Sequence, residues 1–226
     1  EMVLSAAYRQ DNKATAELVA KDPANIMVAR GPRTRLNAEM IRDNALVVSG
    51  LLAPNMLGAS VMPPQPDGIW QTDYSGAQWK TATGPNRYRR ALYTYWKRTS
   101  PYPSMLTFDA PPRDLCSAQR IPTNTPLHAL ITLNDPVYLE CSQALGKRML
   151  EKGSSLADQI THGYLLTTNE MPNPKTVQIL TKLHGELLAD FKQNPENAKK
   201  LADTAEDAAH TVLANTILNL DAALTK

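Results

Sequence analysis

The chain has 226 residues and a formal net charge of +2, so it is long enough to bury a substantial core but has no charge excess that would hold a polyanion. No apolar run approaches the roughly 18 residues of a membrane-spanning helix. Two cysteines and four scattered histidines do not make a disulfide scaffold or a metal centre. Residues 1–10 read as the end of a helix and no signal sequence precedes them, so we expect a piece of a longer protein.

The prolines mark helix starts. Of the seventeen, five follow a residue whose side-chain oxygen can cap a helix, and proline at the first helical position loses a donor that had no partner. The pairs are Asp22-Pro23, Thr125-Pro126, Asp135-Pro136, Asn173-Pro174 and Asn194-Pro195. We therefore predict a helix after each pair.

Apolar residues at helical spacing extend this prediction. Helices are expected over 14–20, 22–29, 36–52, 125–133, 135–152, 155–166, 173–193 and 194–220. The last four have short connections and should pack as an antiparallel bundle. The expected fold is mainly α, in a single domain or a fragment of one, with N-terminal helices over 1–52, an irregular segment over 53–124 and the helical bundle over 125–226.

The irregular segment is rich in proline and aromatic residues and includes a run, residues 80–98, with six basic residues and no acidic one. Aromatic rings beside arginines can stack on sugars or bases, or bind sulfated polymers. The candidate binding residues are Trp70, Trp79, Arg90, Tyr95 and Trp96. The alternative is a short β-strand over 92–97, in which aromatic and β-branched residues alternate between two faces.

Charged residues form two further groups. Glu39, Arg42 and Asp43 fall side by side on the predicted 36–52 helix, either as a ligand or metal site or as an ion-pair network. Asp109, Arg113 and Arg120 lie in irregular chain, where arginines often clamp a loop. A catalytic role for Asp109, with Arg113 and Glu39 beside it, is the alternative, and their spatial neighbours decide between the two.

Two motifs near residue 130 have structural interpretations. We interpret Thr125 as a helix cap, and the Asn134-Asp135-Pro136 corner as a sharp change of direction between helices. Arg42, Asp43 and Arg120 join them as structural residues.

Several long motifs resemble the C-terminal domain of unknown function of planctomycete-type surface proteins. They are Ala29-Arg30-Gly31-Pro32-Arg33, Tyr88-Arg89-Arg90-Ala91-Leu92-Tyr93, Trp96-Lys97-Arg98, Phe108-Asp109-Ala110-Pro111, Asn124-Thr125-Pro126-Leu127, Leu133-Asn134-Asp135-Pro136 and Leu218-Asn219-Leu220-Asp221. The resemblance implies secretion to a periplasm or cell surface and no established activity. Haem is implied only for a cytochrome module upstream, so we expect no cofactor here. His128 stands where the family pattern has glutamine, which suggests a capping device, and Cys141 stands where it has a small apolar residue, so a Cys116–Cys141 disulfide remains open.

Two functions follow as hypotheses. The first is a non-catalytic module that binds a surface polysaccharide or another module of the parent protein. The second is a hydrolytic or redox-coupled surface enzyme domain. Nucleic-acid binding through residues 80–98 is disfavoured by the near-neutral net charge.

Overall fold

The computed structural model describes residues 1–70, 76 and 78–225, and in these the chain is mainly helical with no sheet. The α-helices are α1 (Ala16–Lys21), α2 (Ala38–Ser49), α3 (Pro103–Thr107), α4 (Pro126–Asn134), α5 (Pro136–Lys152), α6 (Leu156–Thr168), α7 (Pro174–Gln193), α8 (Pro195–Lys199), α9 (Ala205–Leu218) and α10 (Asp221–Leu224). Three 3-10 helices are η1 (Met2–Leu4), η2 (Gly84–Tyr88) and η3 (Ala91–Tyr93). The expected mainly α class is confirmed.

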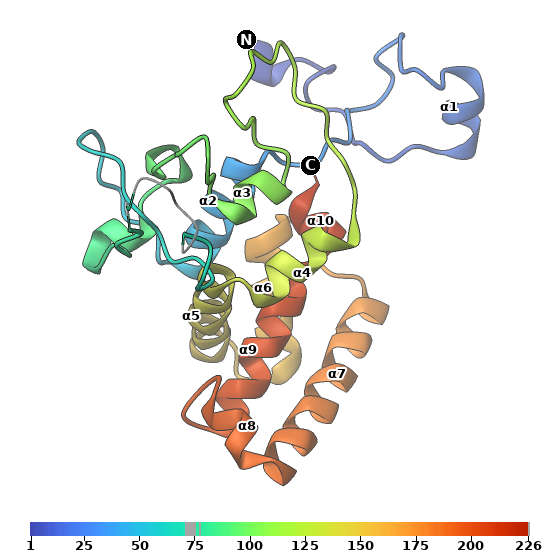
Figure 1. Cartoon of the computed structure of the whole chain (residues 1–226). Coiled ribbons are helices and arrows are strands. Elements are labelled where there is room, and N and C mark those ends of the chain that lie inside the picture. The colour runs from blue at the N-terminus through green and yellow to red at the C-terminus, as the bar shows by residue number, and fades with distance from the viewer. Residues whose placement is uncertain (71–75, 77, 226) are drawn as a thin grey trace.

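The C-terminal half forms the expected bundle (Figure 1). Helix α9 packs against α5 and α7, and α6 packs against α5. Helices α7 and α9 run in opposite directions and are joined through the short α8 (Figure 1). Gly146 on α5 allows a close crossing, because a Cβ there would lie 3.1 Å from the backbone carbonyl of His210 on α9.

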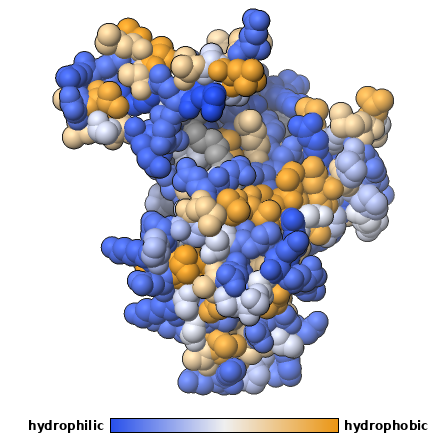
Figure 2. Space-filling model, turned by 180° about the vertical axis from the view of Figure 1, so that it is seen from behind, coloured by the Kyte–Doolittle hydropathy of each residue, from blue (hydrophilic) through white to orange (hydrophobic). Residues whose placement is uncertain are grey.

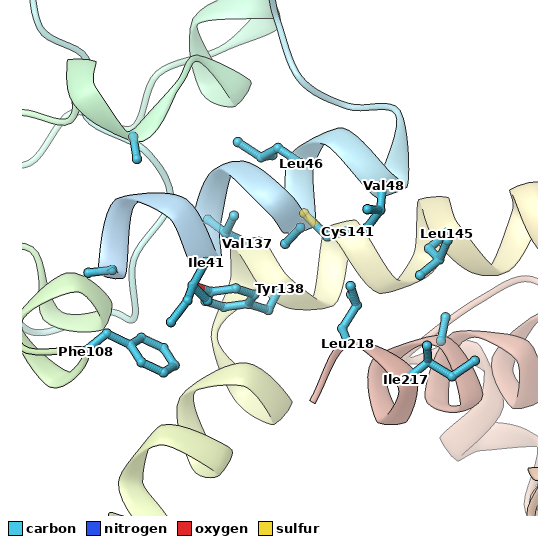
Figure 3. Close-up of a cluster of buried hydrophobic side chains, with 14 of the residues drawn as sticks. Ile41, Leu46, Val48, Phe108, Val137, Tyr138, Cys141, Leu145, Ile217 and Leu218 are labelled. Carbon is cyan, nitrogen blue, oxygen red and sulfur yellow. The ribbon is translucent and has the colours of Figure 1, made fainter. Parts of the chain in front are cut away.

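The main core lies where α2 crosses the bundle (Figure 3). Buried side chains from α2, α5 and α9 meet there, together with Phe108 from the end of α3. Those labelled in Figure 3 on the three helices are Ile41, Leu46, Val48, Val137, Tyr138, Cys141, Leu145, Ile217 and Leu218. The irregular segment is attached to the same core through Ala91, Tyr102 and Met105, so it is anchored by apolar burial and not only by hydrogen bonds.

Four of the five predicted proline starts are confirmed: α4, α5, α7 and α8 each begin with the proline after the proposed cap. The Asp135 carboxylate accepts from the Val137 N–H at 2.9 Å, and Asn173 Oδ1 accepts from the Thr176 N–H at 2.8 Å. These bonds satisfy first-turn donors that the helix itself leaves free.

The predicted helix over 22–29 is wrong. Asp22 follows the end of α1, and its carboxylate accepts the N–H groups of Ile26 and Met27 at 2.9 and 2.8 Å. Asn25 and Val28 have φ of +53° and +51°, which a right-handed helix does not allow. The local side-chain bonds close this stretch as a turn.

The predicted helix over 194–220 is divided into two. Helix α8 ends at Lys199, and α9 starts afresh with the Thr204 hydroxyl accepting from the Asp207 N–H at 3.0 Å. The Thr204-x-x-Asp207 spacing is a capping signal, so the break was visible in the sequence.

The strand over 92–97 is also wrong. Residues 91–93 form η3, and only Thr94 makes an isolated bridge, to Val61. The Val61 N–H donates to Tyr93 O and the Tyr95 N–H donates to Val61 O, both at 2.7 Å. One bridge without a neighbouring ladder does not extend into a strand, so the expected β element is reduced to isolated pairs.

The N-terminal arm, residues 1–34, projects from the body (Figure 1). Asp22 is its one buried residue. Beyond the arm, the Leu36 N–H donates to Leu224 O at 2.8 Å and Arg35 bridges Thr225. From behind, hydrophobic residues gather in a band across the middle of the molecule and also appear on the arm (Figure 2).

Candidate functional site

Three of the predicted binding aromatics lie together. The ring centroids of Trp70 and Trp79 are 5.3 Å apart in an edge-to-face arrangement, and Tyr95 lies 6.2 and 6.5 Å from them. Trp79 also stacks on the buried Tyr102 at 5.8 Å, and its indole N–H donates to Pro63 O at 2.8 Å. Offset and edge-to-face pairs of this kind hold rings in fixed orientations.

Trp70 and Trp79 wall a cavity of about 420 Å³, which we call the aromatic pocket. Its polar lining consists of Gln65, Asp67, Gln78 and Thr81. No lysine or arginine is among the described residues that line it. The buried indole N–H of Trp70 has no acceptor among the described residues. The pocket therefore combines ring faces, amides, one hydroxyl and one carboxylate. Residues 71–75 and 77, within the predicted irregular segment, lie outside the described residues.

Three of the four arginines of the 80–98 run hold the fold together. The Arg87 guanidinium pairs with Glu140 on α5. The Arg89 guanidinium donates to the carbonyls of residues 55, 57 and 59 and lies 3.6 Å from the Tyr93 ring centroid. Arg90, a predicted binding residue, donates to Asp43 on α2 at 3.2 Å, and Asp43 also accepts from the Ala91 N–H at 2.6 Å. These arginines fasten the irregular segment to α2 and α5.

The structure places Trp96 away from the aromatic pocket's lining. Its indole N–H donates to Pro112 O at 3.1 Å, and the Arg113 guanidinium lies 5.3 Å from its ring centroid. Arg113 has a φ of +65° and is exposed. The two residues form a separate contact that holds the loop after α3.

Asp109 lies in a second, larger cleft of about 740 Å³, here called the arginine cleft, which Arg33, Arg35 and Arg120 also line. Its carboxylate pairs with Arg35 and accepts the Thr123 N–H and hydroxyl, both at 2.8 Å. Burial raises the pKa of this carboxyl, but these hydrogen bonds and Arg35 lower it more, so the pKa lies below its ordinary value. Asp109 is therefore ionised and fully engaged at neutral pH.

Glu39 lies behind the cleft wall in a two-pronged pair with Arg120, with distances of 2.6 and 2.9 Å. The hydrogen bond from Arg120 lowers the pKa of Glu39. Asp109 and Glu39 are thus each held by a different arginine. Of the three candidate catalytic residues, Asp109 lines the arginine cleft, whereas Glu39 and Arg113 are not among its lining residues, and the Arg113 charge contributes to the lowered pKa of Glu39.

The predicted structural residues make hydrogen bonds at the ends of helices or between segments of the chain. Arg42 is buried and donates to Arg87 O at 3.3 Å. Thr125 N–H donates to His128 Nδ1 at 3.2 Å, the side-chain half of a capping box, so the expected capping use of His128 is present. His128 Nε2 faces Thr107 O at 2.8 Å, which places the ring proton on Nε2. Asn134 donates to Leu130 O at 2.8 Å.

Both cysteines are free. Cys116 is exposed in the loop before α4, whereas Cys141 is buried on α5 and burial raises the pKa of its thiol to about 12. In the described ranges, no group of three or more His, Cys, Asp or Glu side chains is placed to hold a metal ion. Nor is any helix there long and apolar enough to cross a membrane.

Sequence reasoning missed most of the residues lining both sites. Arg35 and Asp221 in the arginine cleft, and Gln65, Asp67 and Gln78 in the aromatic pocket, carry no local signal of a shared site. Arg33 and Asp221 stand inside the motifs that carry the family resemblance. The hydrogen bond from the Leu36 N–H to Leu224 O brings the chain before α2 next to α10. This long-range contact could not be read from the sequence.

Comparison with known protein families identifies this chain's relationship over most of its length. The family model described as "PSD1: Protein of unknown function (DUF1553)" matches residues 1–184. No curated protein matches the chain, and no solved structure does.

Proposed function

This chain belongs to the PSD1 family, described as proteins of unknown function (DUF1553), and from that premise we propose a function on the geometry of its pockets. The domain is a non-catalytic binding module that holds a neutral polysaccharide in the aromatic pocket. The resemblance to planctomycete-type surface proteins supports placing it in a secreted or cell-surface protein with further modules.

One observation carries the proposal: two tryptophans, fixed by ring contacts, wall a pocket whose other polar groups, among the described residues, are amides, a hydroxyl and a carboxylate. Sugars present C–H faces that pack on aromatic rings and hydroxyl groups that both donate and accept hydrogen bonds. A volume of about 420 Å³ lies in the range of small-ligand pockets.

The pocket chemistry favours a neutral sugar over a sulfated one. Binding of sulfate groups calls for arginine or lysine, and the lining residues in the described part of the pocket include neither. Arg87, Arg89 and Arg90 are engaged by Glu140, backbone carbonyls and Asp43. Three of the six positive charges of the 80–98 run are thus taken up by the fold, and the Lys97 ammonium, 4.8 Å from the Trp70 ring centroid, is not among the described lining residues of the pocket.

The occupied carboxylates weigh against the hydrolytic alternative. A general acid needs a pKa near the working pH, whereas the pKa values of Asp109 and Glu39 are lowered by their partners. Both oxygens of Glu39 are engaged by Arg120. We therefore prefer binding to hydrolysis.

Affinity electrophoresis in gels that contain neutral or sulfated polysaccharides tests the proposal. We expect retardation by a neutral polymer, and loss of that retardation in Gln78→Ala and Trp79→Ala. Gln78 is exposed and Trp79 half-buried, so Gln78→Ala tests the pocket without disturbing the core. Trp96→Ala is the matched control, because it removes a half-buried tryptophan outside the pocket.

Two results would overturn the proposal. One is retardation only by sulfated polymers. The other is equal loss in Trp96→Ala and in folded Gln78→Ala, which would place the binding surface elsewhere.

A further inference from the structure

The arginine cleft is distinct from the aromatic pocket and is built from distant parts of the chain. Its wall includes Arg33 and Arg35 ahead of α2, Asp109 after α3, Arg120 from the following loop, and Leu224 from α10. At about 740 Å³, it has the volume of a drug-sized ligand site.

In the wall of the cleft, Asp109 is already occupied by hydrogen bonds, whereas the arginines keep donors that are not used within the protein. Asp109 accepts three hydrogen bonds, from Arg35 and from the N–H and hydroxyl of Thr123, so little acceptor capacity remains. Arg120 spends one N–H of each terminal nitrogen on Glu39, which leaves three of its five donors. Arg33 contacts Asp221 through one nitrogen, and its side chain is 59% exposed.

The guanidinium groups are also held in position. Glu39 fixes Arg120 from behind the wall, and Asp109, Thr123 and His128 fix Arg35. Rigid guanidinium forks recognise planar anions with two parallel hydrogen bonds. The cleft thus offers oriented donors on Arg120, while its carboxylates are engaged: Asp109 by Arg35 and Thr123, and the 69% exposed Asp221 by Arg33.

One part of the remaining wall is apolar, beside the polar lining residues Thr34, Asn37, Gln119, Asn124 and Thr225. Met40 is 53% exposed, Leu36 and Leu224 are half-buried, and Phe108 closes the inner side. A hydrated inorganic ion would leave this surface without a partner. We propose that the arginine cleft binds a small organic acid, with its carboxylate at Arg33 and Arg120 and its apolar body against Met40 and Leu224.

The proposal is tested by titrating four small molecules into the full chain and recording the backbone amide NMR spectrum at each step. Hexanoate combines both features, acetate lacks the apolar body, hexanol lacks the charge, and hexylamine reverses it. We expect hexanoate to bind at least tenfold more tightly than the other three, with shifts concentrated at residues 33–40 and 119–124.

Variants locate the site. Arg33→Gln and Arg120→Gln should each weaken hexanoate binding at least tenfold. Arg87→Gln is the matched control, because it removes an arginine from a comparable half-buried pair with Glu140 outside the cleft. Arg33 is exposed, so its variant remains informative even if Arg120→Gln unfolds.

Three outcomes would overturn the proposal: no saturable hexanoate binding, equal binding of hexanol or hexylamine, or unchanged binding in Arg33→Gln. Loss of polysaccharide retardation with retained hexanoate binding would separate the two sites, because their linings share no residue.

Discussion

Asp135 is an acidic residue in a place that disfavours its charge. It is 2% exposed, one carboxylate oxygen has no partner among the described residues, and burial raises its pKa to about 6. Its other oxygen caps α5. The ionised Asp135 cap therefore lowers the free energy of unfolding at neutral pH, relative to its protonated form.

The sign of the pH dependence follows from the raised pKa. Between the unfolded value of about 3.9 and the folded value, the folded state binds more protons, so its stability falls as pH rises. Asp135→Asn keeps the capping oxygen and removes the titration. We expect the variant to gain roughly 3 kcal/mol relative to the parent between pH 4 and pH 7.

Urea unfolding at several pH values measures this difference. Asp203→Asn serves as the control, since it makes the same chemical change at an exposed position away from the α5 cap. Parallel profiles for the parent and Asp135→Asn would show that Asp135 is not the titrating group.

Single-residue roles were predictable where they are local. Asp135 as a cap follows from the next residue being proline, and Thr125 follows in the same way. The partners of Asp109 and Glu39 were not predictable. Arg35 and Arg120 lie 74 and 81 positions away from them, and only the tertiary fold selects among the arginines.

At the scale of elements, the crossing of α5 and α9 depends on Gly146. An alanine Cβ would meet backbone atoms of His210 and Thr211 at 3.1 and 3.2 Å, and backbone cannot rotate aside. We expect Gly146→Ala to lower the free energy of unfolding by about 1–2 kcal/mol, because overpacking outweighs the gain in helix propensity.

Gly185→Ala provides the matched comparison. Gly185 lies on α7, and an alanine methyl group at this position would meet no neighbouring atom within 4 Å. This change should stabilise by about 1 kcal/mol through propensity alone. Denaturant unfolding of both variants checks the pair, and a stabilised Gly146→Ala would contradict the close crossing.

Elements were predicted well where a cap and a periodic apolar face agree, as in α5 and α7. The prediction failed at 22–29, where the Asp22 carboxylate bonds to the backbone of Ile26 and Met27 and so competes with helix. It failed at 92–97 because alternation describes a strand only when a partner exists along its length. Val61 supplies one bridge.

For the whole molecule, the N-terminal arm contributes little to the core. No residue of 1–34 belongs to either hydrophobic cluster. Deletion of residues 1–30 should change the melting temperature by less than about 3 °C. Deletion of residues 1–37 also removes the Leu36–Leu224 bond and should lower it by about 5 °C or more.

Scanning calorimetry of the two truncated chains measures this contrast. Equal melting temperatures would show that the contact between residues 36 and 224 carries no stability.

The mainly helical class and the bundle were predictable from periodicity and loop length. The position of α2 across the bundle was not predictable, because its apolar face could pack against the apolar face of any of several helices.

The pairing of residues 33–36 with α10 also has a consequence for the order of folding. Arg33 and Asp221 are 188 positions apart in the chain, so this contact closes one of the longest loops that the molecule contains. Such closure is entropically slow compared with local helix formation. During synthesis, α2 emerges long before α10, and domains fold as their residues become available. The arginine cleft should therefore be the last part of the molecule to form, after the helices around it are already in place.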